Sequence, residues 1–323
     1  MKYLYVLVNS ATGFYTEQTF ISMRSLRHVS PDAFISLLID DKTEKDSNNS
    51  FLKIIKDLVD EYKVITLSPN MPTTARSRFI KTNMREYISG DFLFIDSDTI
   101  WANPVNENDF TFDIMGVLDG HVLFSQNTAK KLNNNYFKKM NCFPNSEIYI
   151  NSGVIYSKDT PFSKDFFNRW HEKWKETSKT GIFVDQPSLN HVLNKEKHLE
   201  KILLPGEYNS QIINSWNFFF KAKIIHYFSS LSSKETLFHS PYLLHQPTFW
   251  ENFKKNINDI QVSNIISTPQ ALFEQDITIK NSDQLIFEQT KLYGFIKDLY
   301  TRKMTGKKSK FDLIEKILTF ISK

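Results

Sequence analysis

The sequence predicts a mixed α/β protein in which a mostly parallel sheet is flanked by helices. Through the first third of the chain, short apolar runs alternate with amphipathic segments in units of about 30 residues, the pattern of parallel strands joined by helices. The 323 residues are 41% hydrophobic, which is ample for a packed core. Their charged share of 24% is ordinary for a globular protein and excludes a disordered or fibrous chain.

The elements of the first half follow from the period of each segment. The predicted strands are Tyr3–Val8, Phe34–Ile39, Lys63–Leu67 and Asp91–Asp96, and the predicted helices are Phe14–Leu26, Phe51–Val59 and Pro72–Ile88. Pro72 suits a first helical turn, and Gly90 is a stop signal after the last of these helices. Because such sheets bind ligands at the carboxyl ends of their strands, we expect the site at that edge.

The second half of the chain is less regular. The predicted strands are Asp113–Leu118, Ile148–Tyr156 and Lys223–Phe228, and the predicted helices are Pro161–Trp174, Gln186–Leu193, Lys291–Tyr300 and Phe311–Ile321. A Lys/Asn-rich loop is expected at 127–147, whereas 250–290 has no readable period. These changes predict a main domain at 1–270 and a C-terminal helical, basic-aromatic tail at 271–323.

Composition argues against several kinds of site and segment. The nine glycines form neither G-x-G-x-x-G nor a P-loop, which argues against a glycine-cradled nucleotide site. The single cysteine, Cys142, excludes an internal disulfide and multi-cysteine metal sites, and it fits a reducing compartment. The amino-terminal apolar run, Tyr3–Val8, is too short for a signal peptide or a membrane span.

The net charge of +4 is concentrated in the tail. Residues 291–323 hold nine Lys/Arg and three Asp/Glu, so residues 1–290 carry about −2, which argues against a nucleic-acid-binding core. Interleaved aromatic and basic residues suit the surface of an anionic membrane. A helix packed on the main domain with a solvated charged face is the alternative. We expect a cytoplasmic protein, with peripheral attachment to the inner face of the membrane as one of these two alternatives.

The strongest functional signal is Asp96-Ser97-Asp98, directly after the apolar run Phe92–Ile95. Carboxylates at the end of a buried strand point into the crevice of the sheet. Two hard oxygen ligands so close together suit Mn²⁺ or Mg²⁺, with phosphates completing the shell. Taken alone, the pair equally fits a cap on the following turn.

Three more motifs follow this one in a fixed order. They are Ile150-Asn151-Ser152-Gly153, Asp185-Gln186-Pro187-Ser188 and Ile224-Ile225-His226-Tyr227. Together the four motifs span about 130 residues, and their order and spacing resemble the retaining glycosyltransferases of family 8. The resemblance covers roughly residues 1–235. It implies the GT-A fold, a Rossmann-like sheet that binds a nucleotide sugar, and it makes 1–270 the catalytic domain.

The resemblance also implies a metal site and a donor site. Asp96, Asp98 and His226 would bind Mn²⁺ or Mg²⁺ against the diphosphate of a UDP-sugar. The residues implied to contact this donor are Tyr15, Arg78, Ser97 and Lys234. A core histidine at 226 and an ordinary packing role for Tyr15 are the alternatives. Arg78 also forms a stripe with Lys81 and Arg85 that fits a solvated helix face.

Three residues are implied at the reacting sugar. Asn151 would hydrogen-bond sugar hydroxyls, with a turn residue before Gly153 as its alternative. Asp185 would hold the donor sugar, and a helix N-cap at the same position is compatible with that role. Gln186 would lie near the anomeric carbon and stabilise the reaction electrostatically, not as a nucleophile.

The sequence departs from the family pattern at two places. His226 is followed by Tyr227 and Phe228, where the family usually has a glycine and then a lysine-proline pair that contacts phosphate. Lys234 would replace that lysine through a different loop, or the phosphate loses one contact. The first strand ends at Asn9, where an acid often lies beside uracil, so metal use is better supported than nucleotide choice.

The expected reaction is transfer of a hexose from a UDP-sugar to a saccharide or glycolipid acceptor in bacterial surface-glycan synthesis. The metal and Arg78 would stabilise the departing diphosphate, and the resemblance implies retention of anomeric configuration. A non-catalytic nucleotide-sugar-binding module is one alternative. A haloacid dehalogenase-type phosphatase, with its own D-x-D after a strand, is another, but it leaves Asp185, Gln186 and His226 unexplained.

Overall fold

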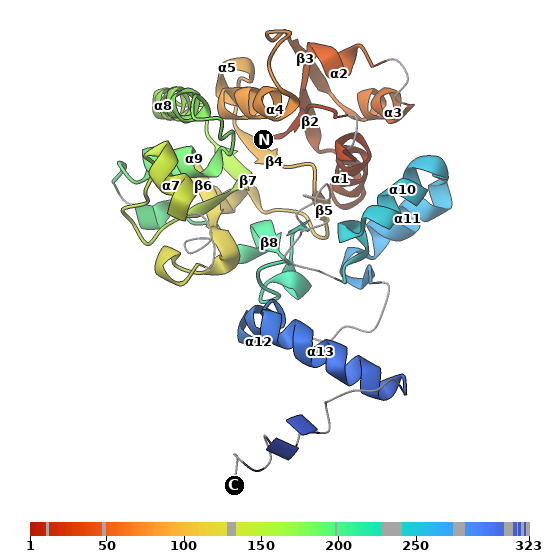
Figure 1. Ribbon diagram of the computed structural model, residues 1–323. Coiled ribbons are helices and arrows are strands. Elements are labelled where there is room, and N and C mark those ends of the chain that lie inside the picture. The colour runs from red at the N-terminus through yellow and green to blue at the C-terminus, as the bar shows by residue number, and fades with distance from the viewer. Residues whose placement is uncertain are drawn as a thin grey trace. The chain divides into compact units, whose positions relative to one another are not determined.

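The structure is a computed structural model, and it describes residues 1–10, 13–46, 50–127, 134–197, 199–227, 241–273 and 282–306, with positions 313, 314, 316, 317 and 320. It divides into two compact units, Met1–Glu274 and Gln275–Lys323 (Figure 1). The division along the chain thus falls after residue 274, whereas the sequence predicted it after residue 270. The assignment of catalysis to the first unit stays a prediction, and so does a separate role for the tail.

A six-stranded sheet of order β3-β2-β1-β4-β7-β6 forms the centre of the first unit (Figure 1). Its strands are β1 Lys2–Leu7, β2 Phe34–Asp40, β3 Glu61–Ile65, β4 Phe92–Ile95, β6 Ile114–Leu118 and β7 Ile150–Ser157. β1 to β4 are parallel, and β7 is antiparallel to both β4 and β6. The mostly parallel sheet is confirmed, with β7 as the reversed strand.

Helices cover both faces of this sheet. Those of the first unit are α1 Tyr15–Val29, α2 Asp41–Glu44, α3 Ser50–Leu58, α4 Thr73–Thr82, α5 Met84–Tyr87, α7 Asn134–Met140, α8 Pro161–Ser178, α9 Gln186–Leu193, α10 Pro247–Lys255 and α11 Asp259–Ser267. Successive side chains of β1 enter different cores, Tyr5 one and Leu4 the other, because a strand alternates its faces. Helices α1 and α3 contribute to the core around Tyr5, and α4, α8 and α9 to that around Leu4.

Local sequence explains where these helices begin. Thr160 precedes α8, and its hydroxyl accepts a hydrogen bond from the Ser163 amide at 3.2 Å, while Pro161 occupies the first turn. The helix predicted at 72–88 is divided at Asn83 into α4 and α5. Near the end of α4, the Lys81 ammonium lies 3.0 Å from Oδ1 of Asp96, the residue that follows β4.

A second sheet of three short strands has the order β5-β9-β8. Its strands are β5 Thr99–Trp101, β8 Ser210–Gln211 and β9 Ile224–His226. β5 begins directly after the Asp96-Ser97-Asp98 turn and is antiparallel to β9, with Thr99 opposite His226. The turn therefore joins the two sheets. Strands of two or three residues have no readable period, and only β9 was predicted.

Other differences lie in segments of weak pattern. The loop expected at 127–147 contains α7, and α10 and α11 lie largely in or beside the segment without a period. The second unit contains α12 Ser282–Glu288 and α13 Lys291–Met304, which confirms the helix predicted at 291–300. The helix predicted at 311–321 falls mostly outside the described residues. Within the described part of the chain, no helix has both the length and the apolarity that crossing a membrane requires.

Candidate active site

The Asp96-Ser97-Asp98 turn is held in place by contacts from three elements. The Asp96 amide donates to the Gly153 carbonyl of β7 at 2.7 Å. Thr99 Oγ1 donates to the Asp96 carbonyl at 2.9 Å, and Thr19 Oγ1 of α1 donates to Ser97 Oγ at 2.9 Å. Backbone and hydroxyl groups therefore position the turn, and none of these three contacts uses a carboxylate of Asp96 or Asp98.

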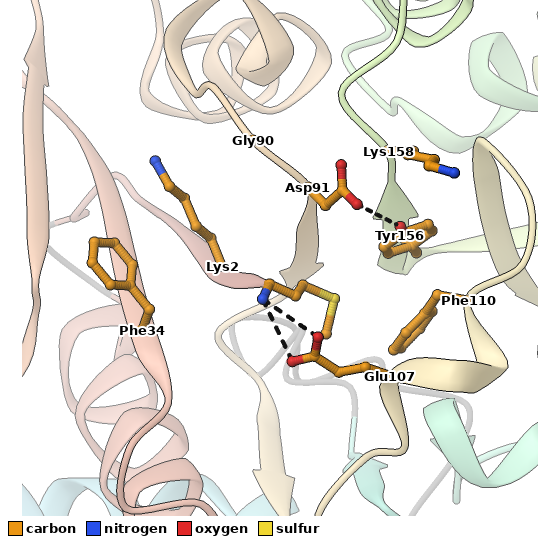
Figure 2. A pocket seen from close by; sticks show the side chains of 9 residues that line it. Lys2, Phe34, Gly90, Asp91, Glu107, Phe110, Tyr156 and Lys158 are labelled. Atoms are coloured by element: carbon orange, nitrogen blue, oxygen red, sulfur yellow. Dashed lines mark hydrogen bonds and ion pairs between the residues drawn. The ribbon is translucent and has the colours of Figure 1, made fainter.

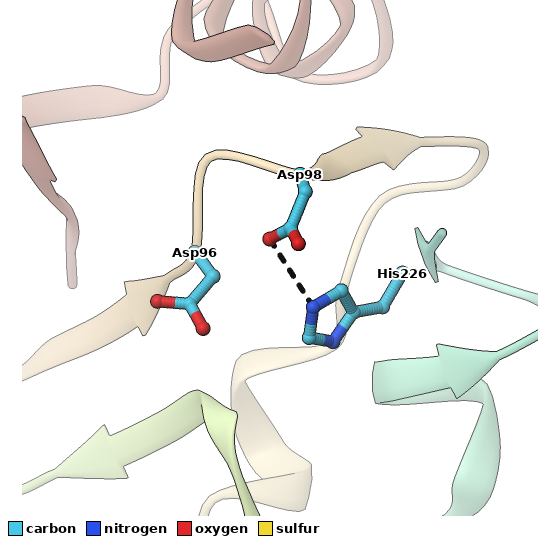
Figure 3. A group of neighbouring side chains, drawn as sticks. All are labelled: Asp96, Asp98 and His226. Atoms are coloured by element: carbon cyan, nitrogen blue, oxygen red, sulfur yellow. Dashed lines mark ion pairs between the residues drawn. The ribbon is translucent and has the colours of Figure 1, made fainter. Parts of the chain in front are cut away.

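His226 reaches this turn through strand pairing. Because Thr99 lies opposite His226 in the small sheet, the histidine is adjacent to Asp98, and the Tyr227 amide donates to the Asp98 carbonyl at 3.1 Å. The imidazole Nε2 lies 3.2 Å from Asp98 Oδ1 (Figure 3). The ring is buried, as the core alternative requires, but it faces a carboxylate and not an apolar neighbour.

Asp96, Asp98 and His226 form a group that fits a divalent metal. Each offers one ligand atom, and these atoms all lie within 4.8 Å of one another (Figure 3). Two carboxylate oxygens and one imidazole nitrogen are a donor set that Mn²⁺ accepts, with remaining positions left for phosphate oxygens or water. Burial raises the pKa of Asp96; Lys81 opposes this rise and the nearby Asp98 adds to it. A bound cation would favour the ionised form of Asp96 and so lower this pKa.

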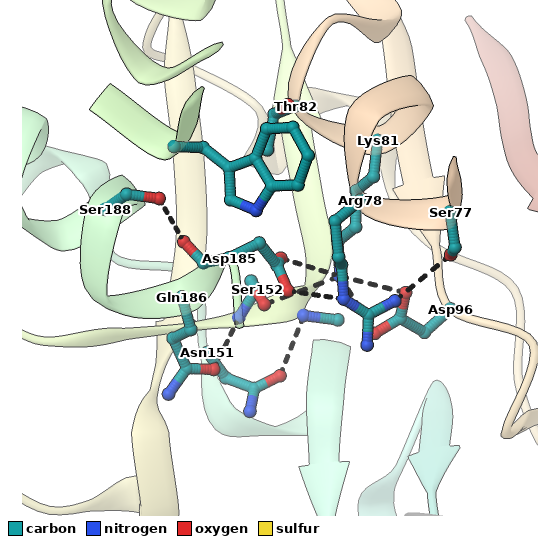
Figure 4. A network of polar contacts seen from close by, with 12 residues as sticks. Ser77, Arg78, Lys81, Thr82, Asp96, Asn151, Ser152, Asp185, Gln186 and Ser188 are labelled. Atoms are coloured by element: carbon teal, nitrogen blue, oxygen red, sulfur yellow. Dashed lines mark hydrogen bonds and ion pairs between the residues drawn. The ribbon is translucent and has the colours of Figure 1, made fainter. Parts of the chain in front are cut away.

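A cluster of two cations and one acid lies on the other side of Asp96. Arg78 Nε is 2.8 Å from Asp185 Oδ1, and Lys81 Nζ is 3.2 Å from Asp185 Oδ2 and 3.0 Å from Asp96 Oδ1 (Figure 4). Burial alone would raise the pKa of Asp185, but Lys81 and Arg78 outweigh it and lower that pKa. Asp185 is therefore held as a carboxylate between two positive charges.

The interpretation of Arg78, Lys81 and Arg85 as a solvated helix face is wrong. The Lys81 side chain is only 2% exposed, and the Arg85 guanidinium is buried over the Phe92 ring and donates to the Ser157 carbonyl at 2.7 Å. Arg78, 34% exposed, is the member that reaches solvent. Arg78 and Lys81 of α4 turn to the carboxylates of Asp96 and Asp185, whereas Arg85, in α5, turns to the backbone of Ser157.

The alternative role of Asp185 as a helix cap is also corrected. Helix α9 begins directly after Asp185, yet the Asp185 side chain makes no capping hydrogen bond and turns to the cations of α4. The Trp170 indole of α8 donates to the Asp185 carbonyl at 3.3 Å and holds this turn. Gln186, the next residue, accepts a hydrogen bond at Oε1 from the Ser152 amide at 3.0 Å. α9 thus brings Asp185 and Gln186 against β7.

Asn151 is not a turn residue, because it lies within β7 and its side chain is buried. Its Nδ2 donates to Asp119 Oδ1 at 2.9 Å, and its Oδ1 accepts from the Gly153 amide at 2.9 Å and from Asn209 Nδ2 at 3.0 Å. Protein groups therefore already bind most of this amide. Asn209 and Asp119 were not among the predicted site residues.

Of the two remaining residues predicted to contact the donor, Tyr15 lies near the site and Lys234 is not described by the structure. Tyr15 opens α1 and is 41% exposed. Burial raises its pKa, Arg78 opposes this, and the carboxylates of Asp98 and Asp96 add to it, so the phenol lies in the field of the site. Lys234 lies outside the described residues.

A separate pocket of about 600 Å³ lies at the opposite ends of the strands. Lys2, Asp91, Phe110 and Tyr156 are among the residues that line it (Figure 2). Lys2 opens β1 and Asp91 precedes β4, whereas Asp96 follows β4. Because ligands of such sheets bind at the carboxyl ends of parallel strands, this pocket is not the donor site.

Comparison with known proteins identifies the class of the chain. Residues 88–252 match the family model described as nucleotide-diphospho-sugar transferase, and the chain belongs to that family. It is therefore a glycosyltransferase, in agreement with the resemblance to family 8, and this excludes the phosphatase alternative. No curated protein matches the sequence. A similar solved structure is the galactosyltransferase LgtC in complex with donor and acceptor sugar analogs, with 12% identity, a TM-score of 0.47, and coverage of 88% of this chain and 98% of that chain.

Proposed function

We propose that this chain is a metal-dependent hexosyltransferase that uses a UDP-sugar and retains the anomeric configuration. The observation that supports this proposal best is the convergence of Asp96, Asp98 and His226, whose ligand atoms lie within 4.8 Å of one another beside the cations of α4. A family that acts on nucleotide-diphospho sugars needs positive charge at the diphosphate. The two sources of positive charge, the proposed metal ion and the cations Arg78 and Lys81, would both lie at the carboxyl end of β4.

Asp96, Asp98 and His226 would hold Mn²⁺, or Mg²⁺ in its place. When bound, the ion supplies Lewis-acid stabilisation of the negative charge that develops on the departing diphosphate. Arg78 supports the same step, because its guanidinium is partly exposed and faces the acids. Lys81 is the buried counterion that keeps Asp96 and Asp185 in place together.

Gln186 fits a stabilising role and not a nucleophilic one. Its Oε1 already accepts a hydrogen bond from the Ser152 amide, so its carbonyl oxygen is committed to the protein. The side-chain NH₂ group is the part that can donate to a substrate oxygen. Asp185 would accept hydrogen bonds from sugar hydroxyls, and the proton of the acceptor hydroxyl would pass to the leaving phosphate. A product of inverted anomeric configuration would contradict this assignment.

The metal assignment is tested with Asp98→Asn. We expect UDP release from UDP-hexoses in the presence of Mn²⁺ and an acceptor to fall by about 10²–10³-fold, because the ion that stabilises the leaving diphosphate would lose one of its charged ligands. Asp165→Asn, at an exposed surface acid, is the matched control and should retain wild-type turnover. Full activity of Asp98→Asn would refute the metal site. Wild-type protein that binds the UDP-sugar without turnover would support the non-catalytic alternative.

For the acceptor we propose a saccharide or glycolipid at the cytoplasmic face of a membrane. Helix α13 exposes Leu292, Phe295, Tyr300 and Met304, and Arg302 and Lys303 lie in its last turn. This combination suits an anionic lipid surface. Chain lacking residues 291–323 should fail to sediment with vesicles that contain phosphatidylglycerol, while its activity on a soluble acceptor is retained. Equal sedimentation of both forms would remove the membrane proposal.

A further inference from the structure

A chain of buried hydrogen bonds runs behind the metal ligands from His226 to Asp119. His226 Nδ1 lies 3.0 Å from Asn209 Oδ1, and Asn209 Nδ2 donates to Asn151 Oδ1 at 3.0 Å. Asn151 Nδ2 in turn donates to Asp119 Oδ1 at 2.9 Å. All four side chains are buried, so bulk water does not compete for these hydrogen bonds.

One backbone amide sets the direction of every bond in this chain. The Gly153 N–H can only donate, and it donates to Asn151 Oδ1, which identifies that atom as the oxygen. Asn209 must therefore turn its NH₂ group to Asn151 and its oxygen to His226. An oxygen can only accept, so the imidazole Nδ1 carries the proton that Asn209 Oδ1 accepts. Asp119, an acceptor as a carboxylate, completes the chain at its other end.

The protonated Nδ1 determines what the other ring nitrogen offers. Nε2 faces Asp98 Oδ1 at 3.2 Å, and in the neutral ring it keeps the lone pair that a metal ligand needs. We propose that Asn209 is a positioning residue that fixes the tautomer and the orientation of His226 for metal binding. Residues that hold a ligating imidazole in this way typically affect metal affinity by about 10–100-fold. The inference rests on the proposed function, since it needs His226 to be a metal ligand.

Asn209 also connects the metal ligands to Asn151, which we place near the donor sugar. Its two polar atoms serve two different neighbours, Oδ1 for His226 and Nδ2 for Asn151. The two connections can be separated by substitution. Leucine removes both bonds at similar size, whereas aspartate keeps an acceptor for His226 but opposes Asn151 Oδ1 with a second oxygen.

The test measures Mn²⁺ affinity without turnover, by electron paramagnetic resonance of free Mn²⁺ in the presence of UDP. We expect Asn209→Leu to weaken Mn²⁺ binding by about 10–100-fold. Asn209→Asp should bind Mn²⁺ as the wild type does, while its affinity for the UDP-sugar falls relative to UDP. Asn168→Leu, at an exposed position of α8, is the control and should change neither.

Each result of this test decides the inference. Folded Asn209→Leu with wild-type Mn²⁺ affinity would overturn it, and so would Asn209→Asp that loses Mn²⁺ as the leucine variant does. If the leucine variant does not fold, nitrogen NMR of wild-type His226 with Mg²⁺ and UDP decides: a protonated Nδ1 supports the inference, and a bare Nδ1 overturns it. Wild-type protein that binds neither Mn²⁺ nor UDP would instead refute the proposed function, and the inference with it.

Discussion

The two sides of the Asp96-Ser97-Asp98 turn are built from different chemistry. On the side of α4, positive and negative charges hold one another, and on the side of β9, neutral amides form directed hydrogen bonds. The charged side consists of Arg78, Lys81 and Asp185, and the amide side of Asn151, Asn209 and His226. Coulombic attraction depends weakly on direction, whereas a hydrogen bond weakens steeply with angle. We therefore expect the α4 side to lose stability when a charge is removed. The β9 side should instead lose metal affinity when a side chain is displaced.

The largest effect is expected on the charged side, from Lys81→Met. This change leaves Asp96 and Asp185 close together without the buried ammonium between them. Breaking a buried ion pair by removing one partner costs about 3–5 kcal/mol, and Arg78 remains beside Asp185, so we expect about 3 kcal/mol of lost stability. Denaturant unfolding of the metal-free protein measures it.

The control for this change is Lys164→Met, which removes an exposed lysine from an ion pair with Asp159 and should alter the free energy of unfolding by less than about 1 kcal/mol. If Lys81→Met proved as stable as this control, charge balance would not be what holds the α4 side together. Addition of Mn²⁺ should restore part of the stability that the variant has lost, because a cation again lies beside Asp96.

An intermediate effect is expected on the amide side from Gly153→Ala. A Cβ at this position would lie 2.3 Å from His226 Cε1 and 2.9 Å from Asn151 Oδ1, so the imidazole must move. We expect Mn²⁺ affinity to fall by about 10–100-fold with no charge altered. Gly294→Ala, where a Cβ meets nothing within 4 Å, is the matched control. Unchanged Mn²⁺ binding by Gly153→Ala would show that the position of His226 is not critical.

The smallest effect concerns His171, which supports α4 from α8 through a 2.8 Å contact between its Nδ1 and Thr82 Oγ1. Burial, with a smaller contribution from Lys175, lowers the pKa of His171 to about 4. Between pH 6.5 and 4 the unfolded chain binds the additional proton, so stability rises with pH across this window and is lost as pH falls. His171→Gln should remove this dependence.

At pH 5.5, His171 should lower the free energy of unfolding by about 1 kcal/mol relative to pH 7. Between pH 7 and 4.5, the free energy of unfolding should depend less steeply on pH for His171→Gln than for the wild type. His121, whose pKa burial also lowers to about 4, retains its own share of the slope in both proteins. Identical slopes for wild type and His171→Gln would contradict the burial of a neutral imidazole beside α4.

The group of Asp96, Asp98 and His226 was easier to predict from the sequence than the residues around it. Asp96 and Asp98 could be predicted because they end an apolar strand, and the motif order brought in His226. Lys81 was assigned to a solvated stripe, since helical spacing identifies a face but not what covers it. Asn209 carries no motif signal, and the role that we propose for it follows only from its hydrogen bonds to His226 and Asn151.

The sequence by itself predicted the approximate positions of β1 to β4 and of the longer helices between them, and that two acids follow β4. Apolar side chains recur with the period of their own segment, so this information is local. Only the tertiary structure decided that β7 runs antiparallel, that β5 pairs with β9, and that Lys81 turns inward to Asp185. Each of these depends on contacts between residues far apart in the chain, and such pairings leave no trace in the period of either segment.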